Sequence, residues 1–349
     1  HPLHRGSLRS IAHAIGAHGG NSDHVEQVVV VLQQLGDDRR ERRVLQLRVA
    51  VRATPGLLDG RAAVRGALEA RAPTIADLAL DPTLAGVDLE GLLLFDTETT
   101  GLAGGTGTLP FVVGLGWFEQ GRLRLSQLLL ERPGREGPIL GFLAERLKKA
   151  SCLITYNGKS FDWPLIRARF VMNRLPVPDA PPHLDLLHCA RRVFRHRPGG
   201  ARLIQFESEV LGFHRVGDIP GAEIPERYFR YLRSGDGSLL EPVITHNAHD
   251  VVLLAALLGE LSRQYEARQA EDPRDGLGFA TVAARAGDAE RALTFAQASA
   301  LQTSDGPLQA EALALAAEVW RRQGKHASAA EALVRALRAA GAPRRPALH

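Results

Sequence analysis

The 349-residue chain has few cysteines, no long apolar run and no marked excess of charge of either sign. Its cysteines, Cys152 and Cys189, are too few and too far apart for a disulfide framework or a C-x-x-C zinc site, which favours a reducing compartment. No segment offers the roughly 18 consecutive apolar residues that span a membrane, and the first residues lack the layout of a signal peptide. We therefore expect a cytoplasmic protein with no membrane partner.

The composition permits a nucleic-acid partner without requiring one. The formal net charge is only +4, a mild excess that is compatible with binding to nucleic acid. Hydrophobic residues make up 45% and charged residues 23% of the chain, as is usual for a globular protein. The length allows two domains, or one large domain with appendages.

The apolar pattern divides the chain into three parts. Residues 1–83 form an N-terminal extension that we expect to be partly disordered, because its first twenty residues are rich in Gly and His. Residues 84–268 have the pattern of an α/β domain, and residues 275–342 are rich in Ala and Leu. In this last part, segments 277–301 and 307–340 resemble two tetratricopeptide-like helical hairpins, which are a candidate surface for a protein partner.

The α/β domain begins with a predicted antiparallel meander. Strands at 92–95, 111–118 and 123–130 are separated by the Gly-rich loop Gly101–Thr108 and by Glu-Gln-Gly-Arg. That loop lacks the Gly-Lys-Ser/Thr ending of a phosphate-binding P-loop, so a structural turn is favoured. Helices are then expected at 136–150, 163–173 and 251–261, and strands at 152–156 and 184–187. Strands followed by alternating helices and strands indicate a mixed sheet.

Two carboxylates, Asp96 and Glu98, end the first buried strand of this domain. Residues i and i+2 of a strand point to the same face, so the two acids emerge side by side. Like charges in such a place need a counter-charge, and a divalent cation is the simplest one. The alternative is that these acids only cap the following turn.

Two later motifs add acids at the ends of predicted elements. Asp162 follows Asn157-Gly-Lys-Ser-Phe161 where a strand gives way to a helix, and His246-Asn-Ala-His249-Asp250 opens the helix at 251–261. Hard oxygen ligands suit Mg²⁺ or Mn²⁺, and two such ions can stabilise the attacking and leaving oxygens of phosphodiester hydrolysis. An imidazole can accept the proton of the attacking water.

These motifs, in this order, resemble the DEDD superfamily of 3′–5′ exonucleases, which have a ribonuclease-H-like fold. More closely, residues of about 84–265 resemble the YprB-type ribonuclease-H-like family. The shared motifs are T-T-G-L-A-G-G-T-G-T, Val113-Gly-Leu-Gly, Gly217-Asp-Ile-Pro-Gly and His246-Asn-x-x-Asp. The resemblance implies an α/β fold, with a mixed sheet flanked by helices and a helical, tetratricopeptide-like C-terminal appendage.

The resemblance also implies roles for individual residues. The metal-binding acids would be Asp96, Glu98, Asp162 and Asp250, holding two Mg²⁺ or Mn²⁺ ions. The superfamily has Tyr four residues before the last Asp, or His five before it, whereas this chain has His246 four before it. His246 is therefore the candidate general base, and His249 is its competitor.

The implied activity is metal-dependent 3′–5′ exonucleolytic hydrolysis of nucleic acid, with single-stranded DNA weakly favoured over RNA. Two alternatives stay open: an exo- or endoribonuclease with the same site, and a non-catalytic nucleic-acid-binding or scaffold protein. The candidate substrate-binding residues are Thr97, Asn157, Phe161, Arg191, Arg192 and Arg195.

Several of these side chains have an alternative structural role. Asn157 can cap the following helix instead of contacting substrate, and the arginines can form a solvated helix face instead of contacting phosphate. Asp185 lies between His183 and His188 at a spacing typical of metal ligands, but a structural or supporting role is favoured. Tyr228, Phe229 and Tyr231 can stack on bases, although core packing is favoured.

Overall fold

The computed structural model describes residues 29–35, 44–50, 58–101, 107–197, 202–212, 215 and 217–341. It forms two compact units. The first comprises residues 1–69, 87–186 and 206–259, and the second comprises residues 70–86, 187–205 and 260–349. The first twenty residues, predicted to be disordered, lie outside the described residues. Most of the turn predicted across Gly101–Thr108 also lies outside them.

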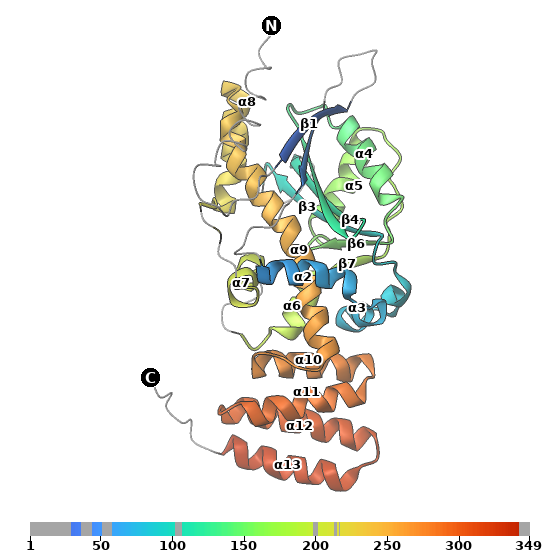
Figure 1. Cartoon of the computed structure of the whole chain (residues 1–349), viewed down its shortest axis with the longest axis vertical. Helices are drawn as coiled ribbons and strands as arrows, with labels where there is room; N and C mark the ends of the chain where they lie inside the picture. The colour runs from blue at the N-terminus through green and yellow to red at the C-terminus, as the bar shows by residue number, and fades with distance from the viewer. Residues whose placement is uncertain are drawn as a thin grey trace. The chain divides into compact units, whose positions relative to one another are not determined.

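A seven-stranded mixed sheet forms the centre of the first unit (Figure 1). Its strands, in spatial order, are β1 (Val29–Leu35), β2 (Val44–Ala50), β5 (Arg122–Leu129), β4 (Pro110–Glu119), β3 (Leu92–Thr99), β6 (Cys152–Thr155) and β7 (His183–Asp185). Strands β3, β4 and β5 form the antiparallel meander expected from the sequence, and β6 and β7 run parallel to β3. The hairpin β1–β2, which pairs with β5, was not predicted.

Helices cover both faces of this sheet. The helices that lie wholly or mostly in the first unit are α2 (Leu58–Glu69), α4 (Gly137–Leu147), α5 (Asp162–Met172), α7 (Leu203–Glu209), α8 (Ile224–Ser234) and α9 (Glu241–Ala267), with short 3-10 turns η3 (Gly221–Glu223) and η4 (Gly237–Leu240). Thr97 on β3 bonds to Asp162 at the start of α5, whereas Gly116 on β4 faces Val251 of α9. Because alternate residues of a strand point to opposite faces, α5 and α9 lie on opposite faces of the sheet. This architecture confirms the expected mixed sheet flanked by helices.

Helix α9 begins ten residues earlier than its sequence indicates. The prediction placed the helix start at Val251, but Asp250 is the tenth residue of α9. The polar residues Thr245–Asn247 suggested a boundary, yet Asn247 is fully buried against the sheet. Gly237–Ala267 is long and apolar enough to cross a membrane, but 61% of its most apolar window is buried. The core helix of a folded domain passes the same test, so this is weak evidence for a membrane span.

The second unit is helical in its described residues. It contains α3 (Ala72–Ala79), η2 (Pro82–Gly86), most of α6 (Leu186–Val193), α10 (Pro273–Ala286), α11 (Ala289–Gln302), α12 (Gly306–Arg322) and α13 (His326–Ala340). Helices α10–α13 stack in sequence order (Figure 1). The turns at Gly287 and Gly324 make two helical hairpins, and the Ala five residues after each glycine is buried. The predicted helical hairpins are confirmed.

Candidate metal centre

Asp96 and Glu98 project from β3 toward α9, as the strand alternation required. Asp96 lies opposite Gly114 of β4, which in turn lies opposite Gln127 of β5. Asn247 of α9 lies over this row, since its amide donates to Asp96 Oδ2 at 2.8 Å and accepts from Gln127 Nε2 at 2.9 Å. A neutral amide thus orients Asp96, and Glu98 beside it is only 8% exposed.

Gly114 and Gly116 allow α9 to approach the sheet this closely. A Cβ on Gly114 would collide with the Asn247 side chain, and a Cβ on Gly116 would lie 2.8 Å from Val251 Cγ1. The motif Val113-Gly-Leu-Gly therefore serves close helix packing beside the acids. Asn247 was not predicted as a site residue, although this pair of glycines in a buried strand was a signal for such an approach.

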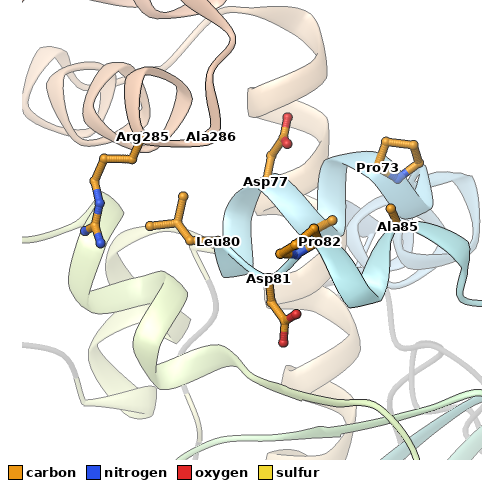
Figure 2. A pocket seen from close by; sticks show the side chains of 9 residues that line it. Pro73, Asp77, Leu80, Asp81, Pro82, Ala85, Arg285 and Ala286 are labelled. Atoms are coloured by element: carbon orange, nitrogen blue, oxygen red, sulfur yellow. The ribbon is translucent and has the colours of Figure 1, made fainter.

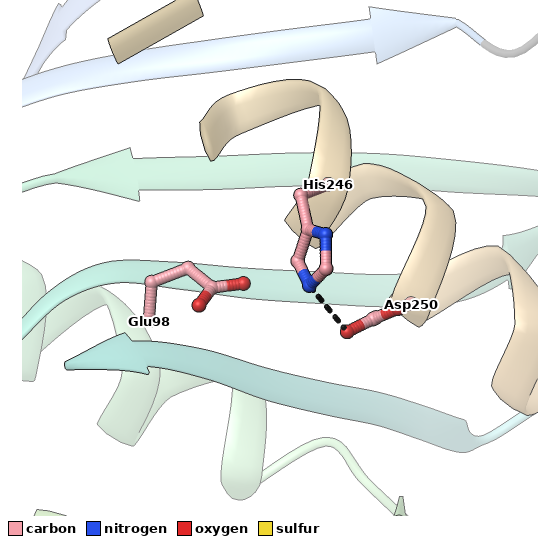
Figure 3. Close-up of side chains that lie close together, drawn as sticks. All are labelled: Glu98, His246 and Asp250. Carbon is pink, nitrogen blue, oxygen red and sulfur yellow. Dashed lines mark ion pairs between the residues drawn. The ribbon is translucent and has the colours of Figure 1, made fainter. Parts of the chain in front are cut away.

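Glu98, His246 and Asp250 come together in one cluster (Figure 3). One ligand atom from each of the three residues lies within 4.8 Å of the others. His246 and Asp250 are one turn apart on α9, and His246 Nε2 lies 3.5 Å from Asp250 Oδ2. Figure 3 shows the Glu98 carboxylate reaching from β3 toward the imidazole. Within the described part of the chain, this is the group whose geometry could hold a metal ion.

Asp162 reaches β3 from the start of α5. It is 5% exposed, and its Oδ1 accepts a hydrogen bond of 2.5 Å from the Thr97 hydroxyl. Thr97 alternates with Asp96 and Glu98 along the strand, so its hydroxyl is directed to Asp162 and away from the α9 face. Asp162 therefore lies on the other face of β3 from Asp96 and Glu98, close enough for its charge to add to the effect of burial and raise the pKa of both.

The electrostatics of these acids show a shortage of positive charge. Burial, followed by the charges of Asp250 and the other carboxylates, raises the pKa of Asp96 well above its ordinary value. Burial and the charges of Asp250 and Asp162 raise the pKa of Glu98 to about 8. Burial raises the pKa of Asp162 to about 6, against the hydrogen bond from Thr97. A bound cation would favour the ionised form of each group.

Arg215 is a buried cation that contacts Asp250. Its side chain is 4% exposed, and its Nη2 donates to Asp250 Oδ1 at 2.5 Å. The same guanidinium donates from Nε to Glu207 at 2.7 Å and from Nη1 to Asp218 Oδ2 at 3.2 Å. Its single charge is therefore shared among three carboxylates. Arg215 was not predicted as a site residue, because nothing in the spacing of the arginines distinguishes it from the others.

The histidine positions differ in their surroundings. His246 lies in the cluster with Glu98 and Asp250, and its Nδ1 is 2.8 Å from Asp218 Oδ1. Burial and the charge of Arg215 lower the pKa of His249. His249 also has contacts in the structure, but it lies outside the three-residue cluster of the described chain.

The loop before α5 is held by Asp185. The backbone N–H groups of Asn157 and Lys159 donate to its two carboxylate oxygens at 2.8 and 3.0 Å. Asp185 is 3% exposed, so this geometry gives it a loop-supporting role. Asn157 is exposed with a φ of 66°, and Phe161 is half-buried at the N-cap of α5.

The three predicted phosphate-binding arginines lie in the second unit, whereas the acids lie in the first. Arg192 Nη1 donates to the carbonyl of Leu78 at 3.2 Å, and Arg195 Nη2 pairs with Glu311 at 2.5 Å. Arg191 is exposed. Two of the three guanidinium groups thus have partners within the helical unit.

The aromatic residues of α8 belong mainly to the core. Tyr228 is fully buried, stacks on Phe111 with a centroid distance of 4.1 Å, and donates to the carbonyl of Leu130 at 2.9 Å. Tyr231 is 6% exposed, whereas Phe229 is 39% exposed. The favoured core role agrees with the packing of the two tyrosines but is wrong for Phe229.

A separate hollow of about 360 Å³ lies in the second unit (Figure 2). Residues of α3, η2 and the end of α10 line it, among them Asp77, Asp81 and Arg285. It contributes no residue to the acidic cluster.

Comparisons with known proteins agree with this architecture. Residues 93–262 match a family model described as RNase_H superfamily. The chain is also 38% identical over 182 residues to a protein of Bacillus subtilis (strain 168) named Uncharacterized protein YprB. That match covers 51% of this chain and 44% of the relative, so the chain spans less than half of the relative's length. The matched region contains all four acids, and its fold is ribonuclease-H-like.

Proposed function

We propose that this chain is a nuclease whose ribonuclease-H-like domain, residues 84–268, hydrolyses phosphodiester bonds of nucleic acid with the help of divalent cations. The main support is electrostatic: burial and the charges of Asp250 and Asp162 raise the pKa of both Asp96 and Glu98, so the four carboxylates lie near one another. Buried like charges are unfavourable unless a cation joins them. The ribonuclease-H-like fold itself suggests a nucleic-acid hydrolase.

The donor set fits Mg²⁺ or Mn²⁺. Carboxylate oxygens are the ligands that these hard cations prefer, whereas the two cysteines lie elsewhere in the sequence. The four acids would hold two such ions. When bound, such ions stabilise the charge that develops on the attacking and leaving oxygens of a phosphodiester.

The protein's own groups perform the remaining steps. Asn247 orients Asp96 through its hydrogen bond, and Thr97 holds Asp162. His246 accepts the proton of the attacking water at Nε2, the ring nitrogen that faces Asp250. The candidate contacts to substrate stay Thr97, Asn157, Phe161, Arg191, Arg192 and Arg195.

The preferred reaction is 3′–5′ exonucleolytic hydrolysis, with single-stranded DNA favoured over RNA, in the cytoplasm. Residues 275–342 form a separate tetratricopeptide-like appendage that recruits a protein partner. Residues 1–83 form an extension of the catalytic domain. The type and direction of hydrolysis follow from the resemblance of the motifs to the DEDD superfamily, whereas the location, the appendage and the extension follow from composition and from the Ala- and Leu-rich repeats.

A degradation assay tests the proposal. Matched single-stranded DNA and RNA, labelled at either the 3′ or the 5′ end, are incubated with Mg²⁺ or Mn²⁺ and, separately, with EDTA. We expect metal-dependent loss of the 3′ label first, and a stepwise ladder from 5′-labelled DNA. Internal cleavage would identify an endonuclease, and binding without cleavage in either metal would overturn the enzyme assignment.

His246 has its own test in the same assay. We expect His246→Ala to lower kcat by roughly 10²–10⁴-fold, the usual contribution of a general base. A matched His249→Ala variant should retain most of the activity, since His249 lies outside the cluster. The reverse ranking would transfer the role of base to His249.

A further inference from the structure

We propose that Asp218 is a positioning residue for His246, and that Arg215 couples this pair to the metal ligand Asp250. The inference rests on the proposed nuclease function and assigns roles to residues outside the four acids. It also gives a purpose to the motif Gly217-Asp-Ile-Pro-Gly, whose role the sequence left unassigned.

The contact between His246 and Asp218 selects one form of the imidazole. His246 Nδ1 lies 2.8 Å from Asp218 Oδ1, and both side chains are largely buried, at 15% and 13% exposure. An ionised carboxylate only accepts hydrogen bonds, so Nδ1 carries the hydrogen. In the neutral ring, Nε2 then has a free lone pair. This nitrogen is the one directed toward Asp250 and Glu98.

Asp218 is itself held on both oxygens. The backbone N–H of Ile219 donates to its Oδ1 at 2.9 Å, and Arg215 Nη1 donates to its Oδ2 at 3.2 Å. Gly217, directly before it, has a φ of 74°, a conformation that glycine adopts without strain. The turn therefore directs Asp218 toward α9.

Arg215 connects this pair to the acidic cluster. One guanidinium contacts Asp218 through Nη1 and Asp250 through Nη2, while Glu207 of α7 binds its Nε with both carboxylate oxygens. Glu207 is 2% exposed and binds Nε with both oxygens, so it holds the guanidinium in place. Hydrogen-bonded partners of this kind orient a catalytic side chain and keep its tautomer.

A double-mutant cycle distinguishes a positioning role of Asp218 from a purely structural one, because the two roles predict different losses of kcat in the absence of His246. We expect Asp218→Asn to lower kcat by roughly 10–100-fold, with little change in KM, because an amide can donate to Nδ1 and so favour the wrong tautomer. In a His246→Ala background, the same change should have no further effect on kcat. An equal loss in both backgrounds would overturn the proposal.

The tautomer of His246 provides a readout that does not depend on activity. In ¹⁵N NMR spectra of the full chain, with the His246 signals assigned by their loss in His246→Ala, we expect hydrogen on Nδ1 in the unsubstituted protein. In Asp218→Asn we expect it on Nε2. An unchanged tautomer would contradict the assignment, even if the protein proved to have no nuclease activity.

Two further variants guard against loss of the fold. Asp236→Asn is the matched control, because Asp236 is an exposed acid whose Oδ1 only caps η4 by accepting from Ser238. It should leave kcat and the His246 signals unchanged. If Asp218→Asn unfolds, Asp218→Glu retains an acceptor and should retain hydrogen on Nδ1; hydrogen on Nε2 in that variant would also overturn the proposal.

Discussion

The first unit buries acidic side chains in two contrasting ways. Glu136, at the start of α4, is 3% exposed and is bound by its own arginine, since Arg169 donates to its oxygens at 2.5, 2.7 and 3.0 Å. Among the residues that the structure describes, no arginine or lysine forms an ion pair with Asp96 or Glu98 on β3. Asn247, a neutral donor, binds Asp96, and the nearby Arg215 contacts Asp250.

The difference indicates what each region is for. A buried acid with a bidentate arginine is compensated within the folded chain and contributes to structure. Acids that crowd together without such a partner have raised pKa values and lower the stability of the metal-free fold. Such an arrangement is a feature of sites that receive a charged ligand. The same packing thus produces a structural ion pair at Glu136 and, at β3, a carboxylate cluster whose geometry could hold a cation.

The largest expected effect comes from removing charge at β3. We expect Asp96→Asn to reduce metal-dependent hydrolysis by roughly 10³-fold or more, because a metal ligand is lost. The unfolding free energy in EDTA should stay the same or rise, since one of several repelling carboxylates is gone. Initial rates on labelled single strands and urea unfolding at pH 8 measure the two quantities. Full activity in this variant would show that Asp96, like Glu136, is not needed for hydrolysis.

The reciprocal substitution should have the opposite result. Glu136→Gln leaves the buried guanidinium of Arg169 uncompensated, so we expect a loss of about 3 kcal/mol in unfolding free energy. Activity per folded molecule should be unchanged at a temperature where the variant is folded. Urea unfolding followed by circular dichroism gives the first value. An unchanged unfolding free energy would show that Glu136, like the acids on β3, does not stabilise the fold.

The pH dependence of stability is the smallest of the three effects. The pKa of Glu98 is about 8 in the folded protein against an ordinary value of 4.5, so the folded state holds a proton that the unfolded state has released between these values. The stability of the metal-free protein should therefore fall as the pH rises from about 4.5 to 8. Asp162, whose pKa is raised to about 6, acts in the same direction at the lower end of this range.

Thermal unfolding in EDTA across this range checks the sign. Glu98→Gln should flatten the profile, and saturating Mn²⁺ should reverse it, because the metal binds the ionised carboxylates. Stability that rises steadily with pH in EDTA would mean that these acids are already compensated in the folded chain.

Much of the fold was predictable because its signals are local. The meander follows from apolar runs separated by turn residues, and the helical hairpins follow from their glycines and from alanines at matched positions. The pairing of Asp96 with Glu98 on one face needed only the two-residue period of a strand. The placement of His246 and Asp250 on one side of a helix needed only the helical period. This placement is correct, although the predicted start of the helix was wrong.

The remainder depends on contacts between residues that are distant in the sequence. Asn247 gains its role from Gly114, more than a hundred residues away, and nothing local to Asn247 indicates burial against a strand. Arg215 is one of many arginines, and its importance comes from three carboxylates on separate segments. Hairpin β1–β2 has a charged connection and apolar runs too short to distinguish a strand from other structures.

Direct measurement of cation binding gives the sharpest test of the β3 site. EDTA-treated protein, freed of chelator, is titrated with MnCl₂ at pH 8 by isothermal titration calorimetry, beside Asp96→Asn and Glu136→Gln. We expect two Mn²⁺ ions per chain in the unsubstituted protein and in Glu136→Gln, and a loss of most binding in Asp96→Asn. Equal Mn²⁺ binding by Asp96→Asn and the unsubstituted protein, or binding by neither, would contradict the assignment of this carboxylate cluster as a metal centre.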